Sequence, residues 1–293
     1  MKGGYGFMAK SPAHTFGQEI GNLLEQIIAP ALQHVCDSRG LYLDKKGVRG
    51  KARPGKKVRW EDRFGNWHDL DFVIERNGSA EKRGTPLAFI ESAWRRYTKH
   101  SKNKAQEIQG AVLSVVEKYK LNGPITAVLL AGEFTEPSIQ QLRSLGFHIL
   151  YIPYEKIIKA FDGVDLDAEF DEDTKDSEVK KKLDALRKLD ARNRQALCDS
   201  LLSVNKKIID DFIIDMERTL DRSVKRVVII PLYGTDHEFL TKEDAIDFLN
   251  SFGVEDKLSS FKKYEVMIEF SNGDKIDGVF SEKIQALRFI NAI

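Results

Sequence analysis

The sequence predicts an α/β fold followed by a long helical region and a small α+β unit. Apolar residues recur at helical spacing over about 15–36, and short apolar runs then alternate with further helical segments up to about residue 152. Residues 177–222 return to helical spacing. Near the end, Asn272-Gly273 separates two apolar runs, a pattern typical of a β-hairpin.

The first part of the chain supports this prediction element by element. Thr15 is the expected N-cap of the first helix. Apolar runs predict strands near 68–75 and 87–93, followed by a helix over about 102–120 that Asn122-Gly123-Pro124 ends. A strand, a helix and a strand complete the pattern, at 125–131, after Thr135 up to Leu145, and at 147–152.

The second part begins with an acidic stretch, 163–178, that we interpret as a linker. After the helical region 177–222 we expect a strand at 224–232, a helix near Thr241, the hairpin strands 264–270 and 275–280, and a short helix from Ser281. The predicted domains are therefore 1–162, α/β, and 179–293, helical plus small α+β. The second domain would serve recognition, packing or dimerisation.

The composition is that of a soluble globular protein, with 42% hydrophobic and 31% charged residues among 293. No apolar run approaches the roughly 18 residues that a membrane span needs. The N-terminus lacks the apolar core of a signal peptide. The two cysteines, Cys36 and Cys198, lie far apart without CxxC spacing, so we expect reduced thiols, a cytoplasmic protein and no structural zinc site.

Charge is distributed unevenly along the chain. Residues 1–162 contain 25 Lys and Arg against 17 Asp and Glu, whereas the remainder contains 21 against 28. Eight of the cations lie within 44–59, and a second basic run covers 95–104. The basic half is therefore the expected partner of nucleic acid.

Two carboxylates stand out near the ends of neighbouring predicted strands. Asp71 lies within the run 68–75 and Glu91 within 87–93, and the basic run follows the second strand directly. Two carboxylates can bind a divalent cation, and adjacent cations can bind a phosphate backbone. The combination predicts metal-dependent phosphodiester hydrolysis.

This arrangement resembles the PD-(D/E)XK nuclease superfamily over roughly residues 14–160. Asp71 matches the first motif and Glu91 the acidic position of the second, and Glu19 fits the place of a first-helix Glu that often completes the site. The resemblance implies a restriction-endonuclease-like mixed sheet flanked by helices. It also implies Mg²⁺, with Mn²⁺ as a substitute, bound by Asp71, Glu91 and Glu19.

The sequence departs from the family pattern at two positions. Ala93 occupies the place of the motif lysine, and the residue before Asp69 is His68 and not proline. Some members of the superfamily supply a displaced catalytic residue from the following helix, where Lys102 and Lys104 lie here. Both flank its apolar face, and Lys104 is preferred because Lys102 is nearer the helix end.

The resemblance implies double-stranded DNA as the partner and a homodimer as the form that cuts both strands. The residues expected to contact DNA are basic side chains of the two clusters: Arg53, Lys56, Lys57, Arg95, Arg96 and Lys99. The expected function is a type II restriction-type endonuclease. Two alternatives remain open: a repair or recombination nuclease of the same fold, and a non-catalytic DNA-binding protein whose nuclease site has decayed.

Overall fold

The fold is built around a five-stranded mixed sheet with the strand order β1-β4-β5-β6-β7. A computed structural model describes residues 11–97, 101–231, 236–252 and 263–293. β1, β4 and β5 pair antiparallel, whereas β5, β6 and β7 pair parallel. The strands are β1 (Tyr42–Lys45), β4 (Phe72–Arg76), β5 (Thr85–Arg95), β6 (Ile125–Gly132) and β7 (Phe147–Pro153).

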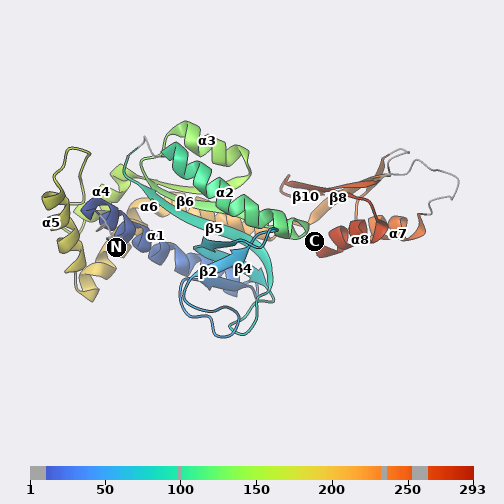
Figure 1. Cartoon of the computed structure of the whole chain (residues 1–293), viewed down its shortest axis with the longest axis horizontal. Helices are drawn as coiled ribbons and strands as arrows, with labels where there is room; N and C mark the ends of the chain where they lie inside the picture. The colour runs from blue at the N-terminus through green and yellow to red at the C-terminus, as the bar shows by residue number, and fades with distance from the viewer. Residues whose placement is uncertain (1–10, 98–100, 232–235, 253–262) are drawn as a thin grey trace, which may run out of the picture.

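Helices cover both faces of this sheet (Figure 1). One face packs against α1 (Pro12–Asp37), α4 (Tyr154–Asp162) and α6 (Ala191–Leu220), and α5 (Asp176–Arg187) packs on α1. The other packs against α2 (Ser101–Tyr119), which continues into the 3₁₀ turn η2 (Lys120–Asn122), and α3 (Glu136–Ser144). The α/β fold with a helix-flanked mixed sheet agrees with the prediction.

The helix starts follow from local chemistry. The hydroxyl of Ser11, rather than Thr15, accepts the N-cap hydrogen bond of α1, from the backbone N–H of His14. Thr135 caps α3 as predicted, and Thr241 caps α7 (Lys242–Ser251).

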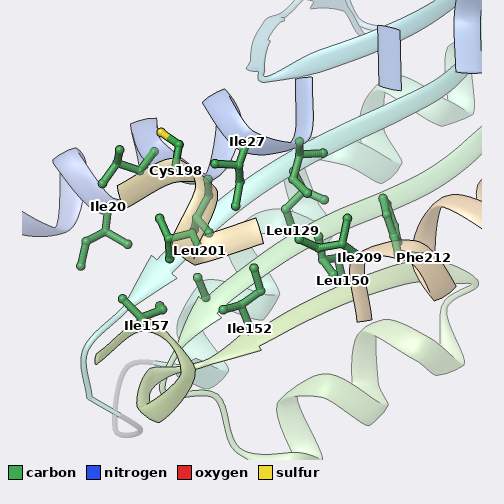
Figure 2. Close-up of a cluster of buried hydrophobic side chains, with 14 of the residues drawn as sticks. Ile20, Ile27, Leu129, Leu150, Ile152, Ile157, Cys198, Leu201, Ile209 and Phe212 are labelled. Atoms are coloured by element: carbon green, nitrogen blue, oxygen red, sulfur yellow. The ribbon is translucent and has the colours of Figure 1, made fainter. Parts of the chain in front are cut away.

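The largest apolar core lies between the sheet and α1, α4, α5 and α6. Figure 2 shows part of this core. Residues far apart in the sequence meet there: Ile20 and Ile27 of α1, Leu129 of β6, and Leu201 and Phe212 of α6. The sheet covers one side of α1, and other helices cover another. Because both sides are buried, α1 needs a wide apolar surface, which explains its dense apolar pattern.

The predicted linker is part of this core. Ala168 and Phe170, from the stretch 163–178, are almost fully buried in it, together with residues of α5 and α6. The domain boundary predicted at 163–178 therefore does not coincide with a break between cores. The core of the C-terminal part, which is separate from those on the two faces of the main sheet, begins only after α6.

This separate core belongs to a small C-terminal unit at one end of the molecule (Figure 1). Its antiparallel sheet has the order β11-β10-β8-β9 and packs against two helices. The elements are β8 (Val224–Pro231), β9 (His237–Phe239), α7, β10 (Tyr264–Phe270), β11 (Lys275–Phe280) and α8 (Lys283–Ala292). The hairpin predicted from Asn272-Gly273 is confirmed.

The run predicted as one strand over 68–75 is two strands. β3 (Trp67–Leu70) pairs only with β2 (Val58–Glu61), forming a two-stranded ribbon, whereas β4 belongs to the main sheet. Asp71 lies at the break between them.

Candidate functional site

A cavity of about 1020 Å³ lies between the N-terminal parts of α1 and α2, at the end of β5 where Glu91 to Arg95 lie. Both predicted carboxylates, Asp71 and Glu91, line it. Its walls come from α1, β5 and α2, together with Lys46.

Strand register brings the central residues together. Phe72 pairs with Ile90 across β4 and β5, so Asp71 and Glu91 fall opposite each other one position further along the antiparallel pair. Lys45 pairs with Phe72 across β1 and β4, which sets Lys46 beside Asp71 in the same way. Sequence reasoning missed Lys46 because eight cations share its segment and only the register distinguishes it.

Asp71 is fixed by the neighbouring strand. The backbone N–H of Ser92 donates to Asp71 Oδ2 at 2.7 Å. Burial raises the pKa of Asp71 above its usual value, against the lowering influence of this hydrogen bond and of the Lys46 and Lys104 charges.

Glu91 is the least satisfied group of the site. Its Oε2 atom is buried without a hydrogen-bond partner. Burial, followed by the charge of Asp71, raises the pKa of Glu91 to about 8. An unpartnered buried carboxylate oxygen is costly, and such groups cluster at functional sites.

The carboxylate of the first helix that faces the cavity is Glu25, whereas Glu19 was predicted. Glu19 does not line the cavity but binds Arg187 of α5 at 3.0 Å. The two positions are six residues apart, about 120° around the helix. Burial, followed by the charge of Asp71, raises the pKa of Glu25 to about 7.

Of the two candidate lysines, Lys104 lines the cavity and Lys102 does not. The charge of Lys104 lowers the pKa of both Asp71 and Glu91, and its Nζ lies 3.5 Å from Glu107. Lys102 is exposed. Ala93, at the motif lysine position, is 4% exposed; it packs into the core under α2 and also lines the cavity, on the same face of β5 as Glu91.

The six predicted DNA-contacting cations divide into four groups. Arg53 is buried and ion-paired with Asp44 at 3.1 Å, so the prediction that it contacts DNA is wrong. Lys56 and Lys57 are exposed, and Lys57 is paired with Asp69. Lys99 lies outside the described residues.

Arg95 and Arg96 both line the cavity. Burial lowers the pKa of Arg95, although Glu107 opposes the shift. The guanidinium of Arg96 lies 4.0 Å from the centre of the Tyr154 ring and donates to the carbonyl of Phe170. Arg96 therefore also anchors the segment after α4 to the wall of the cavity.

The donor set suits a divalent cation that keeps part of its water shell. Across the described residues, no group of three or more His, Cys, Asp or Glu side chains is arranged to hold a metal by itself, so the predicted triplet with Glu19 is not found. Mg²⁺ commonly takes one or two carboxylates plus water and substrate phosphate. Asp71 and Glu91, with one carboxylate oxygen unsatisfied, fit that requirement.

Comparisons with known proteins add little to this geometry. No family model matches the chain, and no curated protein matches it. A crystal structure of a protein of unknown function, AF1548, aligns at a TM-score of 0.29 and 12% identity, covering 65% of this chain and 98% of that one. Within the ranges that the structure describes, no helix is both long and apolar enough to cross a membrane.

Proposed function

We propose that this protein is a Mg²⁺-dependent DNA endonuclease of the restriction type that hydrolyses phosphodiester bonds at the Asp71–Glu91 cavity. The observation that carries the proposal is the register that aligns Lys46, Asp71 and Glu91, with Lys104 facing them from α2. Carboxylates and lysines around one cavity are the groups that bind a metal ion and a phosphate diester together.

Each residue has a distinct task in this chemistry. Asp71 and Glu91 would hold Mg²⁺, which when bound supplies a more acidic water and polarises the phosphate. Lys104 and Lys46 would offset the negative charge that develops on the phosphate oxygens as water attacks phosphorus and one bridging P–O bond breaks.

Glu25 would accept a proton from the attacking water. Its pKa of about 7 is well matched to a general base working near neutrality. Glu25 projects into the same cavity from α1 and not from the sheet, and its charge interacts with those of Asp71 and Glu91.

The test is incubation of the purified chain with plasmid and phage DNA, with and without Mg²⁺ or Mn²⁺, followed by gel electrophoresis. We expect metal-dependent cleavage that Asp71→Ala and Glu91→Ala both abolish while each variant stays folded. Cleavage that persists in either purified variant would disprove the assignment. Discrete fragments would identify a sequence-specific enzyme.

A non-catalytic DNA-binding protein is the second candidate, and Ala93 favours it because the motif lysine is missing from the strand. A retarded but uncut band at every metal concentration would support this function. The buried, unpartnered oxygen of Glu91 favours the enzyme, because a decayed site gains by losing a costly carboxylate.

A further inference from the structure

The β2–β3 ribbon carries an exposed aromatic pair. Phe64, in its turn, is 75% exposed, and Trp67, at the start of β3, is 54% exposed. Within the described ranges these are the only exposed Phe, Trp or Tyr side chains. Exposing a phenyl ring at a loop tip costs solvation free energy, which an apolar contact outside the chain would recover.

The turn holds Phe64 in a defined place. The carboxylate of Asp62, itself 3% exposed, accepts hydrogen bonds from the backbone N–H groups of Phe64 and Asn66 at 2.8 and 2.9 Å. Its other oxygen lies 3.0 Å from both the Asn66 amide and His68 Nε2. Gly65 supplies the positive φ that closes the turn.

Arginines lie beside both rings. The guanidinium of Arg63 is 4.7 Å from the centre of the Phe64 ring, and that of Arg83 is 5.1 Å from Trp67. Arg83 has a buried Nε without a hydrogen-bond partner, and it forms no ion pair with any described residue. An unpaired guanidinium can bind a phosphate, and the exposed rings beside it can stack on bases. Together these groups fit a nucleic acid.

The exposed face of the ribbon leads to the candidate site. Asp69 projects from this face, where Lys57 and Arg59 bind it, and its charge raises the pKa of both Asp71 and Glu91. Trp67 precedes Asp71 by four strand residues, about 13 Å. That length corresponds to about four base pairs of duplex DNA, and Phe64 lies further along the ribbon.

We propose that the β2–β3 ribbon lies in a groove of duplex DNA and inserts Phe64 between base pairs, about four to six base pairs from the scissile phosphate. In this arrangement Arg83 binds a flanking phosphate, Arg63 exchanges its exposed ion pair with Glu117, at 3.4 Å, for a second phosphate, and Trp67 packs against the groove wall. The proposal rests on the DNA-binding part of the proposed function. A rigid turn suits this role, because a wedge must hold its position while it separates stacked bases.

The experiment uses the full chain without divalent metal and a set of 20-base-pair duplexes, each with 2-aminopurine at one position. For wild type we expect increased fluorescence at one position, which reports unstacking, and tighter binding when a mismatch is placed there. Phe64→Ala should remove the fluorescence increase and weaken binding at least about fivefold. Phe64→Trp, which keeps an aromatic ring, should retain both the fluorescence increase and the binding. Leu240→Ala, at a 74% exposed site on the C-terminal unit, is the matched control.

The outcomes separate the wedge from the nuclease. Equal duplex binding and equal fluorescence for wild type and Phe64→Ala would overturn the wedge, even if the wild type cleaves DNA. Loss of the signal in Phe64→Ala would support the wedge, even if the wild type binds without cutting. Binding restricted to single strands, or no binding to DNA, would also overturn it.

Discussion

Asp71 Oδ2 accepts a hydrogen bond from the backbone N–H of Ser92 at 2.7 Å, and this contact ties the break between β3 and β4 to the end of β5. Asp71 thereby lies opposite Glu91, the residue before Ser92, while Glu91 Oε2 stays without a partner. One carboxylate is positioned by the backbone and the other is left free to bind a ligand.

The free carboxylate should reduce stability at alkaline pH. The pKa of Glu91 is raised from 4.5 to about 8 by burial and then by Asp71, so the folded chain keeps a proton that the unfolded chain has lost. The contribution of Glu91 to the free energy of unfolding is therefore fully present below pH 4.5, and it is lost as the pH rises from 4.5 towards 8. Glu91→Gln should raise the melting temperature by several degrees at pH 8.5 and change it little at pH 4.5.

Differential scanning calorimetry of wild type and Glu91→Gln at both pH values measures this difference. Adding Mg²⁺ at pH 8.5 should raise the melting temperature of wild type and not of the variant, because a ligand stabilises only the form that binds it. Equal melting temperatures at pH 8.5 would contradict the assigned burial of Glu91.

The two lysines of α2 should differ sharply in their effect on cleavage. Lys104 lines the cavity and its charge acts on both carboxylates, so Lys104→Ala should lower the cleavage rate by about 10²–10³. Lys102→Ala, at an exposed position outside the lining, is the matched control and should cleave like wild type. Single-turnover kinetics with saturating DNA separates the rate from binding, and similar rates for both variants would remove Lys104 from the mechanism.

Glu25 and Glu19 offer a second matched pair. Glu25→Gln should lower the cleavage rate by about 10²–10⁴ and abolish its rise with pH up to about 7, because the proton acceptor is lost. Glu19→Gln removes only a partly exposed ion pair with Arg187, which is worth at most about 1 kcal/mol. A pH–rate profile of Glu25→Gln that retains the rise would assign the proton transfer to another group.

This pair also marks the limit of prediction from sequence. The apolar spacing of α1 identified the helix, and the apolar runs identified β4, which follows Asp71, and β5, which carries Glu91, as neighbours. Glu19 and Glu25 both flank a wide apolar face, because α1 is buried by the sheet and by other helices. The packing of α1 against the sheet, α5 and α6 decides which flank faces the cavity, and Arg187 of α5 binds Glu19 on the other flank.

Arg53 was misassigned for a related reason. A run of cations has no periodicity that distinguishes a solvated side chain from one that turns inwards to a carboxylate. Asp44 and Glu75 lie on adjacent strands, and they bind Arg53 and Arg49 within a buried network that anchors the basic loop. Such partners become visible only when the strand pairing is known.

Arg53, inside the buried network, and Lys56, outside it, should respond differently to substitution. Arg53→Met leaves the Asp44 carboxylate short of a partner inside the protein, so unfolding should become easier by about 3–5 kcal/mol. Lys56→Met removes an exposed charge and should weaken DNA binding without lowering the free energy of unfolding. Urea titration and fluorescence anisotropy with a labelled duplex measure the two effects, and equal stability of both variants would contradict the network.

The close approach of α1 to β5 gives a final test of how the site is assembled. A Cβ on Gly17 would lie 2.5 Å from Trp94 Cδ1, whereas a Cβ on Gly21, one turn along the same helix, would meet no atom within 4 Å. Gly17→Ala should therefore displace α1 or Trp94 and cost about 1–3 kcal/mol of stability. Gly21→Ala should stabilise the helix by up to about 1 kcal/mol. Because α1 carries Glu25, Gly17→Ala should also slow cleavage at temperatures where the chain is fully folded, and unchanged kinetics there would show that Glu25 does not depend on this contact.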